Sequence, residues 1–136
     1  MMEYVQISGT CELPDISHFA NFKSIVIIEE KVSALRQHEI SKWLVDSGCL
    51  YMMAWGIEAS SWDTSVDLAN IAQFENAEIP DESLVLTTWH DDELLTEVFE
   101  FSKFSALHRY HELNSIIVHF SSVNKESEFR SVYNAT

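Results

Sequence analysis

The sequence SIVIIE at residues 24–29 is the stretch that decides the fold class of this chain. It holds four β-branched residues in a row, and no polar residue interrupts them. An apolar run of this kind is typical of a strand covered on both faces, as in a parallel sheet between layers of helices. The rest of the fold prediction follows from the segments on either side of this strand.

Further apolar runs alternate with segments of helical spacing on the C-terminal side of this strand. Strands are predicted at residues 24–29, 50–55, 84–89 and 115–120. Helices are predicted at residues 33–47, from residue 60, from residue 90 and near residues 125–132. Gly48 marks the end of the first helix. The second helix opens where Ser60 and Asp63 resemble a capping box.

Alternating strands and helices indicate βαβ units, and right-handed crossovers place the helices on both faces of the sheet. The length of 136 residues fits one domain. We therefore predict a single α/β domain over residues 1–136, with three α/β/α layers. Its sheet is expected to be mainly parallel, with four strands in the order 2-1-3-4. Residues 1–22 are weakly patterned and are expected to form a lead-in with room for one short strand.

The charge of the chain is strongly negative, with 8 Lys and Arg against 22 Asp and Glu and a formal net charge of −14. Residues 43–102 contain thirteen acidic residues and neither Lys nor Arg. Because binding to phosphates depends on Lys and Arg, nucleic acid and anionic membranes are not expected as direct partners. A field of one sign favours a basic protein partner or a cation. Solubility alone is the other explanation of this charge.

The two cysteines, Cys11 and Cys49, are too few for a disulfide framework. We recognise no N-terminal signal peptide, and a reducing cytoplasm is therefore the expected location. The longest apolar runs are far too short to span a bilayer.

Acidic residues at two predicted strand ends are candidates for a metal site. Ligands bind open parallel sheets beyond the carboxyl ends of the strands, where the strand order reverses. The order 2-1-3-4 places that point between the first and third strands, so Glu29 and Glu30 are expected beside Asp91 and Asp92. These four carboxylates suit Mg²⁺ or Mn²⁺, which prefer oxygen ligands. The alternative is that Asp91 and Asp92 only offset the positive end of a helix.

His90 is the candidate for proton transfer in such a site. The pKa of an unperturbed histidine, about 6.5, suits a general base, and Asp91 or Asp92 could hold the ring. His90, Asp91 and Asp92 are therefore the predicted catalytic residues.

Three tryptophans fall at or just beyond the ends of predicted strands, next to acidic residues. Tryptophan beside acidic residues on a surface is typical of protein–protein interfaces, although core packing is the commoner role. The predicted binding residues are Trp55, Glu58, Trp62, Asp63, Trp89 and Glu93.

Three motifs carry a family resemblance. AWG at residues 54–56, SSWD at residues 60–63 and TTWHDDE at residues 87–93 together resemble an uncharacterised family of small acidic bacterial proteins, classed as a domain of unknown function. This resemblance implies a bacterial origin and no particular reaction.

Two further resemblances bear on function. The second half of the chain is similar in outline to barstar-type ribonuclease inhibitors, which implies a small acidic protein that blocks a basic active site. The placement of Glu29 and of Asp91 with Asp92 resembles the Toprim catalytic domain, which implies metal catalysis. However, Glu30 or Lys31 stands where the Toprim pattern has glycine, and the acid pair is adjacent rather than spaced by one residue.

The sequence leads to two main functional hypotheses. The first is an acidic, non-enzymatic protein-binding module without a cofactor, such as an antitoxin, immunity or accessory protein that contacts a basic partner. The second is a metal-dependent phosphoesterase or nuclease that uses Mg²⁺ or Mn²⁺, with His90 as base. A third possibility is a sensor in which Trp55 or Trp89 stacks on a planar ligand. The sequence does not set the oligomeric state.

Overall fold

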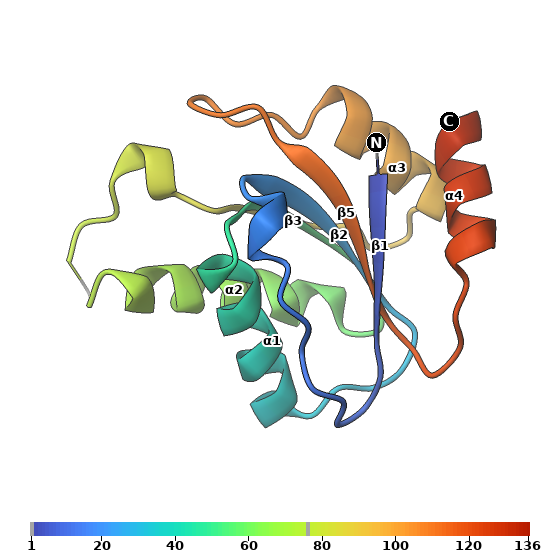
Figure 1. Cartoon of the computed structure of the whole chain (residues 1–136), viewed down its shortest axis with the longest axis horizontal. Coiled ribbons are helices and arrows are strands. Elements are labelled where there is room, and N and C mark those ends of the chain that lie inside the picture. The colour runs from blue at the N-terminus through green and yellow to red at the C-terminus, as the bar shows by residue number, and fades with distance from the viewer. Residues whose placement is uncertain (1, 76) are drawn as a thin grey trace.

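The computed structural model describes residues 2–75 and 77–136, and the described part forms one parallel sheet flanked by helices (Figure 1). The strands are β1 (Met2–Ile7), β2 (Phe22–Ile28), β3 (Cys49–Gly56), β4 (Leu86–Trp89) and β5 (Asn114–Phe120). The helices are α1 (Ala34–Asp46), α2 (Ala59–Gln73), α3 (Leu95–Phe104) and α4 (Glu126–Ala135), with short 3₁₀ turns η1 (Ser17–Phe19) and η2 (Asp81–Ser83). None of the helices described is long and apolar enough to cross a membrane.

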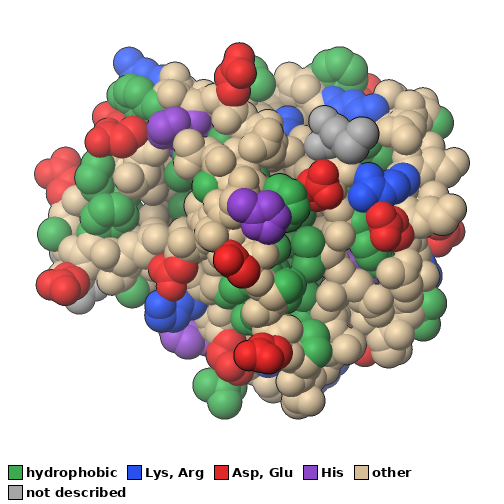
Figure 2. All heavy atoms as spheres, in the orientation of Figure 1, with side chains coloured by type: hydrophobic (Ala, Val, Ile, Leu, Met, Phe, Trp, Pro, Cys, Tyr) green, Lys and Arg blue, Asp and Glu red, His purple; other side chains and the backbone are tan. Residues whose placement is uncertain are grey.

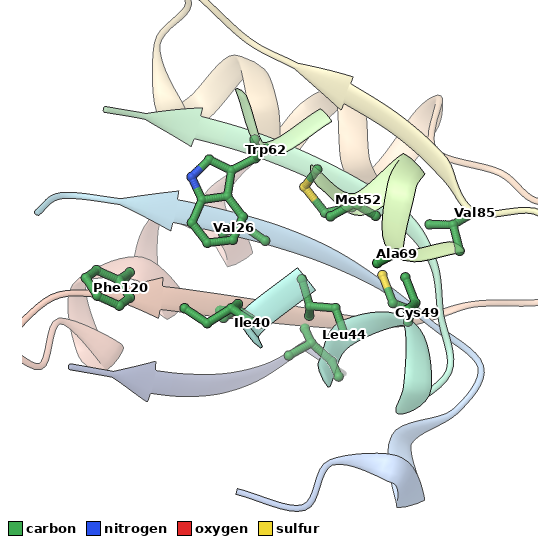
Figure 3. Packing of buried hydrophobic residues seen from close by; sticks show 14 of the residues in the cluster. Val26, Ile40, Leu44, Cys49, Met52, Trp62, Ala69, Val85 and Phe120 are labelled. Atoms are coloured by element: carbon green, nitrogen blue, oxygen red, sulfur yellow. The ribbon is translucent and has the colours of Figure 1, made fainter. Parts of the chain in front are cut away.

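The helices cover both faces of the sheet, which confirms the predicted α/β/α layers (Figure 1). On one face, α1 and α2 pack against the sheet through residues such as Leu44 and Trp62 (Figure 3). On the other face, α3 and α4 contribute Val98, Phe99 and Phe129 to a second buried cluster. All seven residues of β2 are buried, as predicted for a strand covered on both sides.

The predicted number and order of the strands are wrong. The sheet has five strands in the order β1-β5-β2-β3-β4, all parallel. The fifth strand, β1, is an edge strand with a mostly half-buried pattern that includes Glu3 and Gln6, so it lacks an uninterrupted apolar run. After β4, the chain passes through α3 on the face of the sheet opposite α1 and α2. This crossover brings β5 between β1 and β2.

The new order changes which strand ends are neighbours. The predicted first and third strands correspond to β2 and β4, and β3 lies between them. Strand β2 instead pairs with β5 on its other side, with Ile28 opposite Phe120. Glu30 and His90 therefore lie at the same edge of the sheet but two strands apart, and the prediction that they are neighbours is wrong.

Two helix starts also differ from the prediction. Helix α2 begins at Ala59, and its N-cap residue is Glu58, so Ser60 does not cap it. Helix α3 begins at Leu95, and its N-cap residue is Leu94. The backbone N–H of Leu94 donates to the Glu97 carboxylate at 3.2 Å. Residues 90–93 are consequently a loop before the helix rather than its first turn.

Gly56 fixes the distance between the ends of β2 and β3. A Cβ atom at this position would lie 2.2 Å from the carbonyl oxygen of Ile28, and the φ angle of Gly56 is +113°. Both conditions require glycine. The following N–H, that of Ile57, donates to the same Ile28 oxygen at 2.9 Å. The backbone at the end of β3 is therefore held directly against β2.

Candidate functional site

The carboxyl ends of β3 and β4 frame an open depression of about 530 Å³, which we call the acidic hollow. Its lining residues are Trp55, Gly56, His90, Asp91, Asp92 and Glu93. Asp91, Asp92 and Glu93 are all exposed, and within the described residues this lining contains neither Lys nor Arg. Carboxylates are spread over much of the face drawn in Figure 2, so the hollow is distinguished by their proximity rather than by their sign. Three neighbouring carboxylates without a counter-charge create a negative local potential.

Two hydrogen bonds attach the loop at residues 90–93 to β3. The indole nitrogen Nε1 of Trp55 donates to the carbonyl oxygen of Glu93 at 2.8 Å. The backbone N–H of His90 donates to the carbonyl oxygen of Ala54 at 3.0 Å, which continues the β3–β4 ladder by one residue. The loop is thus connected to the sheet at both of its ends.

His90 is buried beneath this loop, with 6% of its surface exposed. Its Nδ1 lies 2.8 Å from Oε2 of Glu93, and its Nε2 lies 2.9 Å from Oγ1 of Thr88. The ring also packs edge-on against Phe101, with 4.9 Å between the ring centroids. A neutral ring with a proton on Nδ1 satisfies both bonds, since it donates to Glu93 and accepts from Thr88. Glu93, rather than the predicted Asp91 or Asp92, holds this histidine, and both ring nitrogens are occupied.

Two acidic residues at this edge have a left-handed backbone. The φ angle is 57° at Asp92 and 54° at Glu58. Residues other than glycine adopt this region rarely and at a cost of about 1 kcal/mol or more. At Glu58 the conformation is supported by Ser61, whose N–H and hydroxyl both donate to the Glu58 carbonyl oxygen. These two bonds therefore help to hold the loop at Glu58 in this shape.

The predicted metal ligands at the end of β2 are engaged in other bonds. Glu29 accepts from Nε2 of His119 and, at 2.9 Å, from Nζ of Lys125. Burial alone would raise the pKa of Glu29, but the hydrogen bonds from Lys125 and His119 outweigh it and lower the pKa. The Glu30 carboxylate accepts hydrogen bonds from the backbone N–H and from the hydroxyl of Ser122, each at 2.7 Å. These two bonds, the backbone one most, lower the pKa of Glu30.

The four predicted ligands do not form one cluster. Glu29 and Glu30 follow β2, whereas Asp91 and Asp92 follow β4, and β3 separates the two pairs. Within residues 2–75 and 77–136, no group of three or more His, Cys, Asp or Glu side chains is arranged to hold a metal ion. The two pairs of carboxylates consequently belong to different parts of the edge.

A buried polar network at β1, β5 and β2 was missed by the sequence analysis. His119 has no exposed surface, and its Nδ1 lies 2.7 Å from the Tyr4 hydroxyl. The Tyr4 oxygen also accepts from the backbone N–H of Lys125 at 3.1 Å, and Phe129 packs edge-on against the histidine ring. With the Glu29 contacts, these bonds join three strands to the start of α4. The available signal was a single histidine inside a buried apolar strand, which requires hydrogen-bond partners.

The predicted binding residues differ widely in exposure. Trp89 is 48% exposed, and Trp55 is partly exposed at the hollow. Trp62 is 1% exposed and packs near Val26 and Met52 in the core, so its prediction as a surface contact is wrong (Figure 3). The reason is the helical spacing of α2, which turns the buried residues Ala59, Trp62, Val66 and Ala69 toward the sheet. Glu58, the N-cap residue of α2, is exposed, and Asp63 in the same helix is half-buried.

Comparison with known proteins places the chain in a family. A family described as a domain of unknown function (DUF7684) matches residues 2–136. The chain belongs to this family. The match covers nearly the whole sequence and agrees with the resemblance to an uncharacterised family. No curated protein and no solved structure matches the chain.

Membership of DUF7684 carries no reaction with it. The function of this protein therefore depends on what its own residues can bind. The acidic hollow combines three exposed carboxylates, the partly exposed Trp55 and a loop that is bonded to β3.

Proposed function

We propose that this protein is a non-enzymatic binding module that presents the acidic hollow to a basic protein partner. The observation that carries the proposal is the loop at residues 91–93, whose three exposed side chains are all carboxylates. The loop backbone is fixed to β3 by the Trp55–Glu93 and His90–Ala54 bonds, and the His90 ring contacts the Glu93 carboxylate from beneath.

A fixed loop favours binding because little conformational entropy is lost when the partner docks. The His90–Glu93 contact, the Trp55–Glu93 bond and the His90–Ala54 bond all act on the same short segment. Carboxylates that are already in place attract Lys and Arg from a distance and increase the rate of association.

Trp89 supplies an exposed apolar contact close to this loop in the chain, outside the lining of the acidic hollow. It ends β4 directly before the loop, and 48% of its surface is exposed. Tryptophan is enriched among the residues that contribute most to binding energy. An exposed tryptophan shortly before the acidic loop therefore suits a partner with an apolar patch near its basic residues.

This function fits an antitoxin, immunity or accessory protein of a bacterial cytoplasm. Such proteins bind a basic surface without chemistry of their own, and the free thiols of Cys11 and Cys49 suit a reducing compartment. The alternative, a metal-dependent phosphoesterase or nuclease, needs Glu29, Glu30, Asp91 and Asp92 together, and β3 separates them in pairs. The geometry thus supports binding better than hydrolysis.

The test is capture of proteins from a lysate of the native host on the immobilised full chain. We expect the captured protein to be rich in Lys and Arg and to elute as the salt concentration rises, since salt screens exposed charges beyond about 10 Å at 0.1 M. The variant D91N/D92N should capture it about tenfold less well.

The matched control is E112Q/E128Q, which removes the same number of exposed carboxylates elsewhere on the surface. It should capture the partner as well as the wild type does. Equal capture by D91N/D92N and the wild type would show that the acidic hollow is not the binding surface. A partner that stays bound at every salt concentration would also contradict the proposal.

A further inference from the structure

Strand β4 is a short edge strand of the sheet, and it pairs with β3 on one side. We propose that the basic partner contributes an extended segment that pairs with the open side of β4. This inference rests on the proposed function, because it specifies how the partner of the acidic hollow is bound.

The backbone of β4 offers hydrogen-bonding groups on its open side. The N–H of His90 points toward β3, where it donates to the Ala54 oxygen. Because these groups alternate in direction along a strand, the N–H and C=O groups of Thr87 and Trp89 point away from β3. In the part of the chain that the structure describes, no turn, loop or side chain bonds to the backbone of Thr87 or Trp89. An extended segment could therefore pair with four backbone groups there.

The two ends of β4 offer different contacts to the side chains of such a segment. Beside the start of the strand lies a second hollow of about 230 Å³, lined in part by Leu84, Leu86 and Tyr110, which are all exposed apolar or aromatic side chains. Beyond the end of the strand lies the acidic hollow. Strands advance about 3.3 Å per residue, so a bound segment would place an apolar residue about four or five positions from a Lys or Arg.

The charge beyond the carboxyl end of β4 favours a basic occupant. Asp91 and Asp92 line the acidic hollow there without a Lys or Arg among its lining residues, whereas Asp81 and Arg109 both line the apolar hollow and offset each other. A second copy of the chain would bring another net charge of −14 against these residues, so self-pairing is disfavoured. The opposite edge strand, β1, is less suited to a basic segment, because the Arg130 guanidinium already donates to the Met2 carbonyl oxygen there.

The experiment uses random twelve-residue peptides displayed on phage, selected on the full chain. We expect the enriched sequences to combine β-branched or apolar residues with Lys or Arg. The best peptide is then synthesised in three forms: one unmodified, and two with N-methyl groups on alternate backbone nitrogens, one for each of the two possible registers. N-methylation removes the donors that pair with β4, so one of the two registers of methylation should weaken binding about tenfold or more.

Two protein variants complete the test. Thr87→Pro removes an outward N–H of β4, and an edge strand tolerates proline at such a position. This variant should weaken peptide binding about tenfold. Thr87→Val is the matched control, because both variants lose the hydroxyl that donates to Asp67 but only the proline loses the N–H. If Thr87→Pro does not fold, the N-methylated peptides still decide the question on the wild-type protein.

Several results would overturn the inference. These are enriched peptides without basic residues, equal binding of every N-methylated form, or no enrichment at all. A wild-type dimer that Thr87→Pro converts to a monomer would identify a second copy of the chain as the occupant instead. A host protein that D91N/D92N fails to capture while Thr87→Pro captures it normally would refute strand pairing and leave the proposed function standing.

Discussion

Replacing His119 with leucine tests the buried network that joins β1, β5 and β2. His119 is fully buried and bonds to Tyr4 and Glu29, and leucine keeps much of its volume without either bond. Each of the two lost hydrogen bonds costs about 1 kcal/mol. Tyr4 and Glu29 each lose one partner, which costs up to a further 1 kcal/mol or so for each; this cost stays small because Lys125 still donates to both of them. We expect the free energy of unfolding to fall by about 2–4 kcal/mol.

The loss is measured by urea unfolding at pH 7, followed by tryptophan fluorescence. For a domain of this size it corresponds to a fall in Tm of roughly 8–15 °C. His119→Gln is the control, because its amide can still donate to Glu29 and should recover part of the loss. The double variant with Glu29→Gln should be less unstable than the sum of the two single variants, since they share one bond.

The pH dependence of this variant gives a second readout. The folded pKa of Glu29 is lowered, so its carboxylate contributes stability above its unfolded pKa, and this stability is lost as the pH falls through the folded pKa. Without the His119 donor the pKa returns toward its ordinary value, and less stability should be lost on acidification. A change of less than about 0.5 kcal/mol at pH 7, with an unchanged acid profile, would refute the account of the network.

The remaining predictions concern a half-buried acid, a buried thiol and two tryptophans. Burial raises the pKa of Asp67, so its ionisation costs stability as the pH rises above about 4; Asp67→Asn should therefore be more stable than the wild type at pH 7 by urea unfolding, and equal stability would contradict this. Burial also raises the pKa of Cys49 to about 11, so the thiol of a Cys11→Ser protein should not react with an aromatic disulfide reagent at pH 8 until the protein unfolds. Trp62→Ala should cost about 3–5 kcal/mol, whereas Trp89→Ala should cost about 1 kcal/mol or less; similar losses would refute the different burial of the two rings.

The sequence predicts the buried strands well because their signal is local. The run of β-branched residues in β2 corresponds to a strand whose seven residues are all buried. Helix α1 follows the prediction as well, with the Ser33 hydroxyl accepting from the backbone N–H of Arg36 at its start. In both cases burial or capping depends on neighbours a few residues away.

The strand order could not be predicted in the same way. The order depends on how many strands the connection from β4 to β5 passes over, and the sequence of α3 does not indicate that number. Strand β1 is recognisable only with its partner, since half-buried edge residues such as Glu3 and Gln6 interrupt its apolar pattern. The predicted neighbourhood of Glu30 and His90 was lost with the order.

The candidate site was predicted in part. Asp91, Asp92 and Glu93 do lie at the carboxyl edge with Trp55, because that edge follows from parallel strands in any order. The role of His90 could not be predicted from the sequence. Helix α3 begins at Leu95 rather than at residue 90, and in the loop before it, which includes the left-handed Asp92, the Glu93 carboxylate contacts the His90 ring. Local sequence does not encode such a contact.

The open side of β4 has a consequence for the behaviour of the protein in concentrated solution. An unpaired strand with apolar side chains is a template for aggregation, and edge strands are commonly protected by charged residues that repel further copies. Asp81, Asp91 and Asp92 stand at the two ends of β4 and act as such gatekeepers. Near the isoelectric point of about pH 4.6 their repulsion is weakest, and the chain should then be most prone to precipitate. The acidity through which we propose that a basic partner is bound thus also keeps copies of the protein apart.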